Sequence, residues 1–246
     1  MNQEGNQSAK GFTLVELMLS MAFISVLMVA IAMTVIQIMN VYNKGVTLRS
    51  VDQAGRGISQ DIKYTLSSSQ ILDVNSAGMT GNDFVLQARL GDDANTRPDG
   101  GRLCTGTYTY IWNTGKGMDY QINRFAAGND VIHLIKIRDN SKEYCDIIRT
   151  PQIQQEGVSE LLSADAANLA VQNFMISSVA SDAAMQQALY QITIELGTGD
   201  ESAIDRPILS TMDATCKPPS DAMSQRDYCA INKFEFTARA GNRGGQ

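Results

Sequence analysis

An uninterrupted apolar run near the start of the chain constrains the fold more than any other feature. Between Phe12 and Met39 there is no Asp, Lys, Arg, Asn, Gly or Pro, and Glu16 carries the only formal charge. As an α-helix, these residues would extend about 40 Å at ~1.5 Å per residue, enough to cross a hydrocarbon core of about 30 Å. A buried core helix would usually be shorter and flanked by caps, so residues 12–39 are predicted to form a transmembrane helix.

A cleavable secretory signal is the main alternative for this run. Ala30-Ile31-Ala32 offers an A-x-A cleavage pattern after an apolar region. Two features argue against it: the positive charge of Lys10 is offset by Glu4, and the apolar run continues past Ala32. A retained helix is therefore the favoured interpretation.

The carboxylate of Glu16 would cost free energy inside a membrane helix unless it had a partner. A carboxylate well inside a membrane helix costs roughly 2.5–3.5 kcal/mol on insertion scales, and less near the interface. Removal of residues 1–11 would create an ammonium group at Phe12, four residues and about one helical turn from Glu16. Glu16 is thus a candidate functional residue rather than a feature of a simple anchor.

The segment Lys10-Gly11-Phe12-Thr13-Leu14-Val15-Glu16 resembles the processing site of type IV prepilins and pseudopilins. The resemblance implies that residues 1–11 are a leader, that a prepilin peptidase cuts between Gly11 and Phe12, and that Phe12 becomes N-methylated. It also implies that Glu16 engages the amino terminus of a neighbouring subunit during assembly. Short segments, residues 52–61, 234–239 and 242–243, are similar to PilW-like or PulJ-like minor subunits.

Residues 40–72 are predicted to continue the helix in an amphipathic form. Five apolar residues recur there at three- and four-residue spacing: Val51, Ala54, Ile58, Ile62 and Leu66. The charged residues between them are suited to a solvent-exposed face. Gly45, Gly55 and Gly57 each weaken a helix by roughly 1 kcal/mol relative to alanine. Local tolerance of glycine is favoured over an unwinding role.

Residues 73–240 are predicted to form one antiparallel, β-rich head, followed by a flexible tail at 241–246. Alternating patterns favour strands at 84–90, 107–112, 120–125, 131–138 and 190–196, a further strand at 142–149 and a weaker final strand at 231–238. Residues 159–168 and 181–188 look locally helical or loop-like. The expected fold class is therefore α+β and pilin-like, a long amino-terminal helix with an antiparallel sheet head.

The four cysteines, Cys104, Cys145, Cys216 and Cys229, all follow the proposed anchor. An extracytoplasmic compartment can be oxidising, so disulfides are expected, with three connectivities open. Cys104–Cys145 across the meander and Cys216–Cys229 around Pro218-Pro219 are the favoured pairs. Zinc is a poor alternative because there is no CxxC and only one histidine.

Signals for catalysis are weak. His133 is the single histidine and alternates with apolar residues in a strand, so a satisfied structural histidine is expected. No cofactor is expected. Calcium is a minor hypothesis at Asp93, Asn95 and Asp99, beside Asp92, or at the second acidic loop of Asp200, Glu201 and Asp205, because neither loop fits EF-hand spacing.

Charge and resemblance together suggest the partners. The net charge of −6 divides into zero for the leader, +1 for residues 12–72 and −7 for the head, which argues against generic nucleic-acid binding.

The resemblance implies a non-enzymatic minor pilin or pseudopilin of a type IV pilus or type II secretion-like filament, active in initiation or at the tip. Its partners would be the prepilin peptidase, major and minor pilins, the inner-membrane assembly platform and the membrane. Before assembly it would be a single-pass cytoplasmic-membrane protein with an extracytoplasmic head, and afterwards part of a surface or periplasmic filament. An uncleaved, membrane-tethered extracytoplasmic binding protein or enzyme is the alternative.

Overall fold

The computed structural model describes residues 13–74, 82–87, 100–114, 132–145, 157–162, 169–182, 184–199, 203–205, 214–218 and 229–241. The chain divides into two compact units, residues 1–43 and 44–246. Helix α1 (Leu14–Ser67) contributes residues to both units, and all described strands belong to the second. The expected α+β class is confirmed.

In the first unit, α1 exposes apolar side chains on all sides. Every residue from Leu14 to Met39 is solvent-exposed, and the most apolar window of α1 has a mean hydropathy of 2.5. Among the described residues, α1 is the one helix long and apolar enough to cross a membrane. The hydroxyls of Ser20, Ser25 and Thr34 donate to the carbonyls of Leu17, Met21 and Ala30, which satisfies them within the helix.

In the second unit, the remainder of α1 buries the predicted stripe. Val51, Ile58, Ile62 and Leu66 are each at most 2 % exposed. The helix ends at Ser67, short of the expected boundary at residue 72. Serine hydroxyls at positions 67, 68 and 69 donate to carbonyls of the last turn and compete with continued helix.

A five-stranded antiparallel meander forms the first sheet. Its strands follow chain order: β1 (Phe84–Gln87), β2 (Gly100–Cys104), β3 (Tyr108–Thr114), β4 (Ile132–Arg138) and β5 (Val158–Leu162). The predicted meander and the strands β1, β3 and β4 are confirmed. The predicted strand at 120–125 lies outside the described residues.

Two predictions in this sheet are wrong. Residues 159–162, part of the segment expected to be helical or a loop, belong to strand β5. Within the strand predicted at 142–149, Glu143–Cys145 is instead a 3₁₀ turn, η1, because the Asp139 carboxylate accepts hydrogen bonds from the backbone N–H groups of Glu143 and Tyr144.

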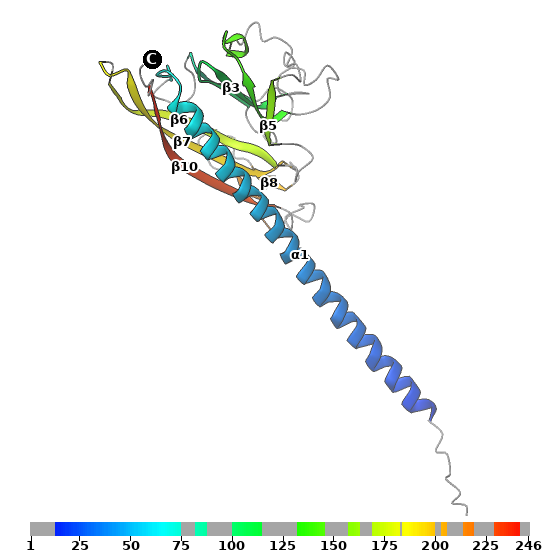
Figure 1. Cartoon of the computed structure of the whole chain (residues 1–246). Helices are drawn as coiled ribbons and strands as arrows, with labels where there is room; N and C mark the ends of the chain where they lie inside the picture. The colour runs from blue at the N-terminus through cyan, green and yellow to red at the C-terminus, as the bar shows by residue number, and fades with distance from the viewer. Residues whose placement is uncertain are drawn as a thin grey trace, which may run out of the picture. The chain divides into compact units, whose positions relative to one another are not determined.

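A three-stranded antiparallel sheet, ordered β10-β7-β6, forms the second layer. It consists of β6 (Leu169–Asp182), β7 (Gln187–Thr198) and β10 (Ile231–Ala240), and a small pair, β8 (Ile204–Asp205) and β9 (Thr215–Cys216), lies apart from it. Figure 1 shows α1 running across this sheet. The strands predicted at 190–196 and 231–238 are confirmed, whereas residues 181–182 and 187–188, expected to be helical or a loop, belong to β6 and β7.

The main core lies where α1 and the two sheets meet. One stack of aromatic rings joins the sheets: Trp112 of β3 lies 4.4 Å from Phe174 of β6, and Phe84 of β1 contacts both. In the same core, Tyr110 donates to the Asp61 carboxylate of α1 at 2.7 Å, and Lys136 pairs with the same carboxylate at 2.9 Å. These contacts hold α1 in one register on the head.

Candidate functional site: the amino-terminal turn and the disulfide-braced head

The first turn of α1 is organised around Thr13 and Glu16. The Thr13 backbone N–H and hydroxyl each donate to Glu16 Oε2 at 3.0 Å, and the Glu16 N–H donates to Thr13 Oγ1 at 3.3 Å. This reciprocal arrangement is a capping box, which satisfies donors that the start of a helix otherwise leaves free. The Glu16 carboxylate therefore stabilises its own helix.

The role of Thr13 was missed in the sequence, although its signal was present. Thr13-Leu14-Val15-Glu16 fits the T-x-x-E pattern immediately before an apolar helix. The same pattern predicts where α1 begins, one residue after Thr13. Gly11 and Phe12, the predicted processing residues, lie outside the described residues.

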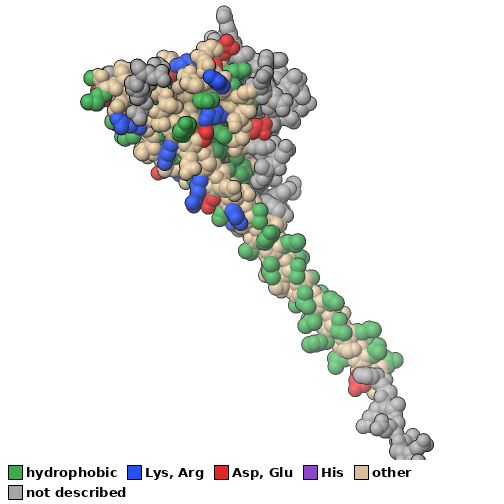
Figure 2. All heavy atoms as spheres, in the orientation of Figure 1, with side chains coloured by type: hydrophobic (Ala, Val, Ile, Leu, Met, Phe, Trp, Pro, Cys, Tyr) green, Lys and Arg blue, Asp and Glu red, His purple; other side chains and the backbone are tan. Residues whose placement is uncertain are grey.

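Glu16 is also the lone formal charge on an exposed apolar surface. Its neighbours Leu14 and Leu17 are 75 % and 51 % exposed, and Figure 2 shows hydrophobic side chains along this part of the helix with one acidic group near its start. In an apolar environment, the capping bonds offset part of the cost of the carboxylate but leave its charge uncompensated. The arrangement can accept a cation.

Both favoured disulfides are present in the structure. Cys104 of β2 bonds to Cys145 of η1 across a Cα–Cα distance of 6.2 Å, and Cys216 of β9 bonds to Cys229 at 5.9 Å. The first bond attaches the turn η1 to the meander. The second closes the loop between β9 and the start of β10.

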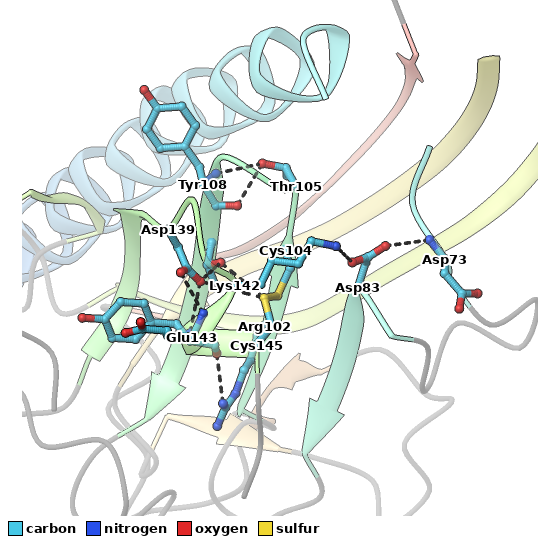
Figure 3. Close-up of a disulfide and its surroundings, with 12 residues drawn as sticks. Asp73, Asp83, Arg102, Cys104, Thr105, Tyr108, Asp139, Lys142, Glu143 and Cys145 are labelled. Atoms are coloured by element: carbon cyan, nitrogen blue, oxygen red, sulfur yellow. Dashed lines mark hydrogen bonds and ion pairs between the residues drawn. A yellow bond between two sulfur atoms is a disulfide. The ribbon is translucent and has the colours of Figure 1, made fainter. Parts of the chain in front are cut away.

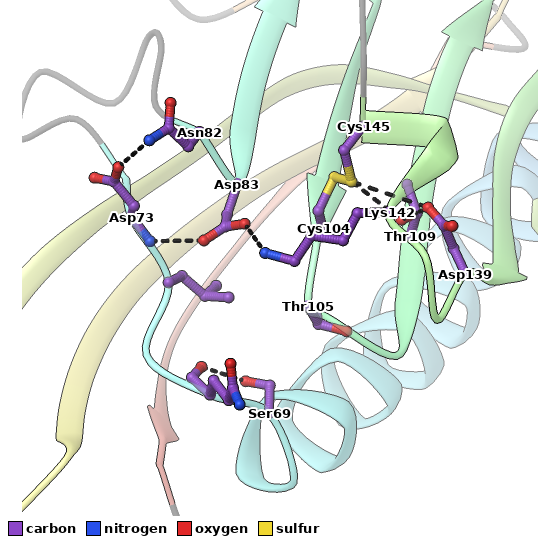
Figure 4. Close-up of polar contacts among 12 residues, drawn as sticks. Ser69, Asp73, Asn82, Asp83, Cys104, Thr105, Thr109, Asp139, Lys142 and Cys145 are labelled. Carbon is purple, nitrogen blue, oxygen red and sulfur yellow. Dashed lines mark hydrogen bonds and ion pairs between the residues drawn. A yellow bond between two sulfur atoms is a disulfide. The ribbon is translucent and has the colours of Figure 1, made fainter. Parts of the chain in front are cut away.

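Figures 3 and 4 show polar contacts on both sides of the Cys104–Cys145 bond. On one side, Asp139 accepts from the Thr109 hydroxyl at 2.8 Å as well as from the η1 backbone. On the other, Lys142 reaches the Asp83 carboxylate at 2.8 Å, and Asp83 also accepts from the backbone N–H of Asp73 at 2.9 Å. The disulfide therefore belongs to a braced corner that links η1, β1 and the segment after α1.

The other sequence candidates give no metal or catalytic centre among the described residues. Asp93, Asn95 and Asp99 lie outside the described ranges, as do Asp200 and Glu201, while Asp205 is exposed on β8. In the described ranges, no three His, Cys, Asp or Glu side chains are grouped to hold a metal ion. His133 is buried, and its Nδ1 contacts the Leu169 carbonyl of β6, as a structural histidine would.

A comparison with known protein families gives a match for the amino-terminal segment. Residues 6–33 match the prokaryotic N-terminal methylation motif. The amino terminus is prepilin-like. The matched segment contains Gly11, Phe12 and the capping pair Thr13 and Glu16, and it supports a relation to the type IV pilin superfamily. Such a motif implies processing by a prepilin peptidase and assembly with other pilins at a membrane, and it indicates a structural subunit rather than an enzyme.

Comparisons with curated proteins and with solved structures gave no match. The relation to pilins therefore rests on the amino-terminal motif and on the fold. The α1 helix with antiparallel sheets in the carboxy-terminal part is consistent with a pilin-like α+β fold.

Proposed function

We propose that the chain is a minor pilin or pseudopilin, of the larger PilW-like or PulJ-like type, in a type IV pilus or type II secretion-like filament. One observation carries the proposal: α1 is exposed and apolar on all sides from Leu14 to Met39, has a single carboxylate in its first turn, and overlaps the matched methylation motif at residues 6–33. Such a surface is stable only in lipid or among other apolar helices.

The structure of the first turn of α1 supports the proposal that the subunit moves from the lipid bilayer to the core of a filament. In the membrane, the capping box stabilises Glu16 from within its own helix. After cleavage at Gly11, a neighbouring subunit would present the ammonium group of its Phe12, and the Glu16 carboxylate would pair with it in the filament core. Charge pairing in a medium of low dielectric constant is strong and favours one register of packing.

The disulfides of the head support an extracytoplasmic location for this part of the chain. Disulfides persist in oxidising compartments and are rare in the cytosol, and all four cysteines of this chain are paired. The leader would then face the cytoplasm, where the prepilin peptidase and the inner-membrane assembly platform act on the same end of α1. By its resemblance to the larger minor subunits, the chain would serve in an initiation or tip complex.

The native amino terminus tests this proposal directly. We expect mass spectrometry of the chain isolated from its source cells to show a start at N-methylated Phe12, with residues 1–11 removed. An intact Met1 would support an uncleaved membrane-tethered protein instead, and a start at Met33 would support an ordinary secretory signal. Either result would overturn the proposal.

A further inference from the structure

Three cations form a row along the outward face of α1 in the second unit. Arg49, Arg56 and Lys63 are spaced by seven residues, which is close to two turns of an α-helix. The spacing places them on one line, about 10.5 Å apart and about 21 Å from first to last. All three are exposed, and the uncharged Gln53 and Gln60 are exposed between them.

The row has no anionic partner within the described part of the head. Arg49 and Arg56 make no side-chain hydrogen bond or ion pair there, and the Lys63 ammonium lies 5.2 Å from the centre of the Phe236 ring. Among the described residues, the row therefore presents its positive charges to solvent without a direct ion pair.

Both acids of this part of α1 are directed to its flanks. Asp52, four residues before Arg56, accepts from the Asn232 amide of β10 at 2.5 Å. Asp61 accepts from Tyr110 of β3 and pairs with Lys136 of β4. The head thus pairs the Asp61 carboxylate with a cation of β4 and draws the Asp52 carboxylate toward β10.

The helix cannot rotate to conceal these cations. Its opposite face buries Val51, Ile58, Ile62 and Leu66 in the main core. Burial of a Leu or Ile side chain contributes about 1.5–3 kcal/mol, so these four residues fix the orientation of α1 on the sheet. The outward direction of the row is a property of the fold.

We propose that the Arg49–Arg56–Lys63 row is a docking surface for the acidic head surface of a neighbouring filament subunit. The proposal rests on the proposed function, since it requires that the chain assembles with similar subunits. Charge complementarity supports this occupant: residues 12–72 of this chain carry +1 while the remainder carries −7, so a head of this kind attracts the helix face of the next subunit. Because the two surfaces differ, the contact is heterologous and suits an open filament.

The length of the row favours a protein surface over a membrane. Lipid headgroups form a layer roughly 5–8 Å deep on each side of the hydrocarbon core. The three cations extend over about 21 Å along the helix axis, which is more than twice the depth of that layer. A folded head offers carboxylates over the required length.

The experiment places a photo-crosslinking amino acid at Gln53 of the full-length chain in cells that produce the filament. Mass spectrometry of the adduct identifies the captured molecule. We expect a peptide rich in Asp and Glu from the head of another filament subunit. The charge reversal Arg56→Glu/Lys63→Glu should lower its yield on the order of tenfold, because like charges would then face each other.

A matched control carries the same change of charge elsewhere on the head. Arg138→Glu/Arg239→Glu alters two exposed arginines outside α1 and should leave the crosslink yield unchanged. Arg56→Gln/Lys63→Gln removes the positive charges without adding acids and should give an intermediate loss. This variant keeps the test decisive if the charge reversal impairs folding.

A lipid or nucleic-acid adduct, a protein adduct insensitive to both substitutions of Arg56 and Lys63, or no adduct from assembled filaments would overturn the docking proposal. These failures are distinguishable from failure of the proposed function. If the processed chain is found in sheared filaments without a charge-dependent adduct, only the docking surface is wrong. If the chain is unprocessed and absent from filaments, the proposed function is wrong as well.

Discussion

Gly55 of α1 lies directly against the Phe234 ring of β10. A Cβ atom at this position would overlap the ring of Phe234, whereas a Cβ at Gly57, two residues later, would meet nothing within 4 Å. The two glycines therefore differ in role despite their similar sequence context. Gly55 permits close packing, and Gly57 only weakens the helix.

Substitution by alanine should separate the two roles. We expect Gly55→Ala to lower the free energy of unfolding by about 1–3 kcal/mol, because the Phe234 ring must move. Gly57→Ala should raise it by about 1 kcal/mol through helix propensity alone. Denaturant unfolding of the full-length chain in detergent measures both, and a stabilising Gly55→Ala would contradict the close contact.

Glu16 combines a local bond with a proposed intermolecular one, and two substitutions can distinguish them. Glu16→Gln keeps an oxygen that can accept from the Thr13 N–H but removes the charge. If pairing with an amino terminus sets the register, Glu16→Gln and Glu16→Ala should both lose incorporation into filaments. Thr13→Ala should cost the helix about 1 kcal/mol and still be incorporated. The amount of each variant in sheared filaments distinguishes the capping role of Glu16 from its pairing with an amino terminus. Normal incorporation of Glu16→Gln would disprove the role of charge.

At the scale of elements, the two disulfides stabilise different parts of the head to different extents. Cys104–Cys145 spans a sequence separation of 41 residues and Cys216–Cys229 one of 13. In the chain-entropy model these loops correspond to about 4 and about 3 kcal/mol. The longer loop also positions η1, whose backbone bonds to Asp139 depend on the same corner.

Removal of each bond should therefore have unequal effects. We expect Cys104→Ser/Cys145→Ser to lower the free energy of unfolding by about 1 kcal/mol more than Cys216→Ser/Cys229→Ser. Thermal or denaturant unfolding of the two variants under identical conditions provides the measurement. A larger loss for the shorter loop would show that local packing, rather than loop closure, dominates.

At the scale of the whole molecule, buried tyrosines link the stability of the head to alkaline pH. Burial raises the pKa of Tyr110, and the neighbouring Asp61 carboxylate raises it further, while the Thr65 hydroxyl opposes the shift. Burial likewise raises the pKa of Tyr190. The folded head therefore holds these protons more tightly than the unfolded chain, in which tyrosine titrates near pH 10.

The sign of the pH dependence follows from this difference. The stabilisation is complete below about pH 10 and is lost as the pH rises above that value, because the unfolded chain deprotonates first. Tyr110→Phe should therefore reduce the slope of unfolding free energy against pH above 10. Unfolding measured between pH 8 and about 11, with tyrosinate absorbance followed in parallel, tests this, and an unchanged slope in Tyr110→Phe would contradict it.

Local patterns predict the features of this protein that solvent and nearest neighbours control. The run from Phe12 to Met39 predicts an exposed apolar helix, since no tertiary contact is needed to make that surface incompatible with water. The stripe of Val51, Ile58, Ile62 and Leu66 likewise predicts the face of α1 that meets the head. The candidate site at Glu16 was predicted for the same reason, because the cost of a carboxylate in an apolar run is a local property.

Features that depend on contacts between distant segments were not predictable. Strand β6 lacks a continuous alternating pattern, because its first four residues are all buried and two register shifts interrupt its pairing with β7. Nor does the pattern around Gly55 reveal that Phe234 packs against it, 179 positions later in the chain. The row of Arg49, Arg56 and Lys63 is visible in the sequence, but its outward direction follows from the face that α1 buries and from the engagement of Asp52 and Asp61 by the strands. Hydrophobicity along the chain thus determines which segments must be removed from water, and the packing of the sheets determines which side chains remain available to a partner.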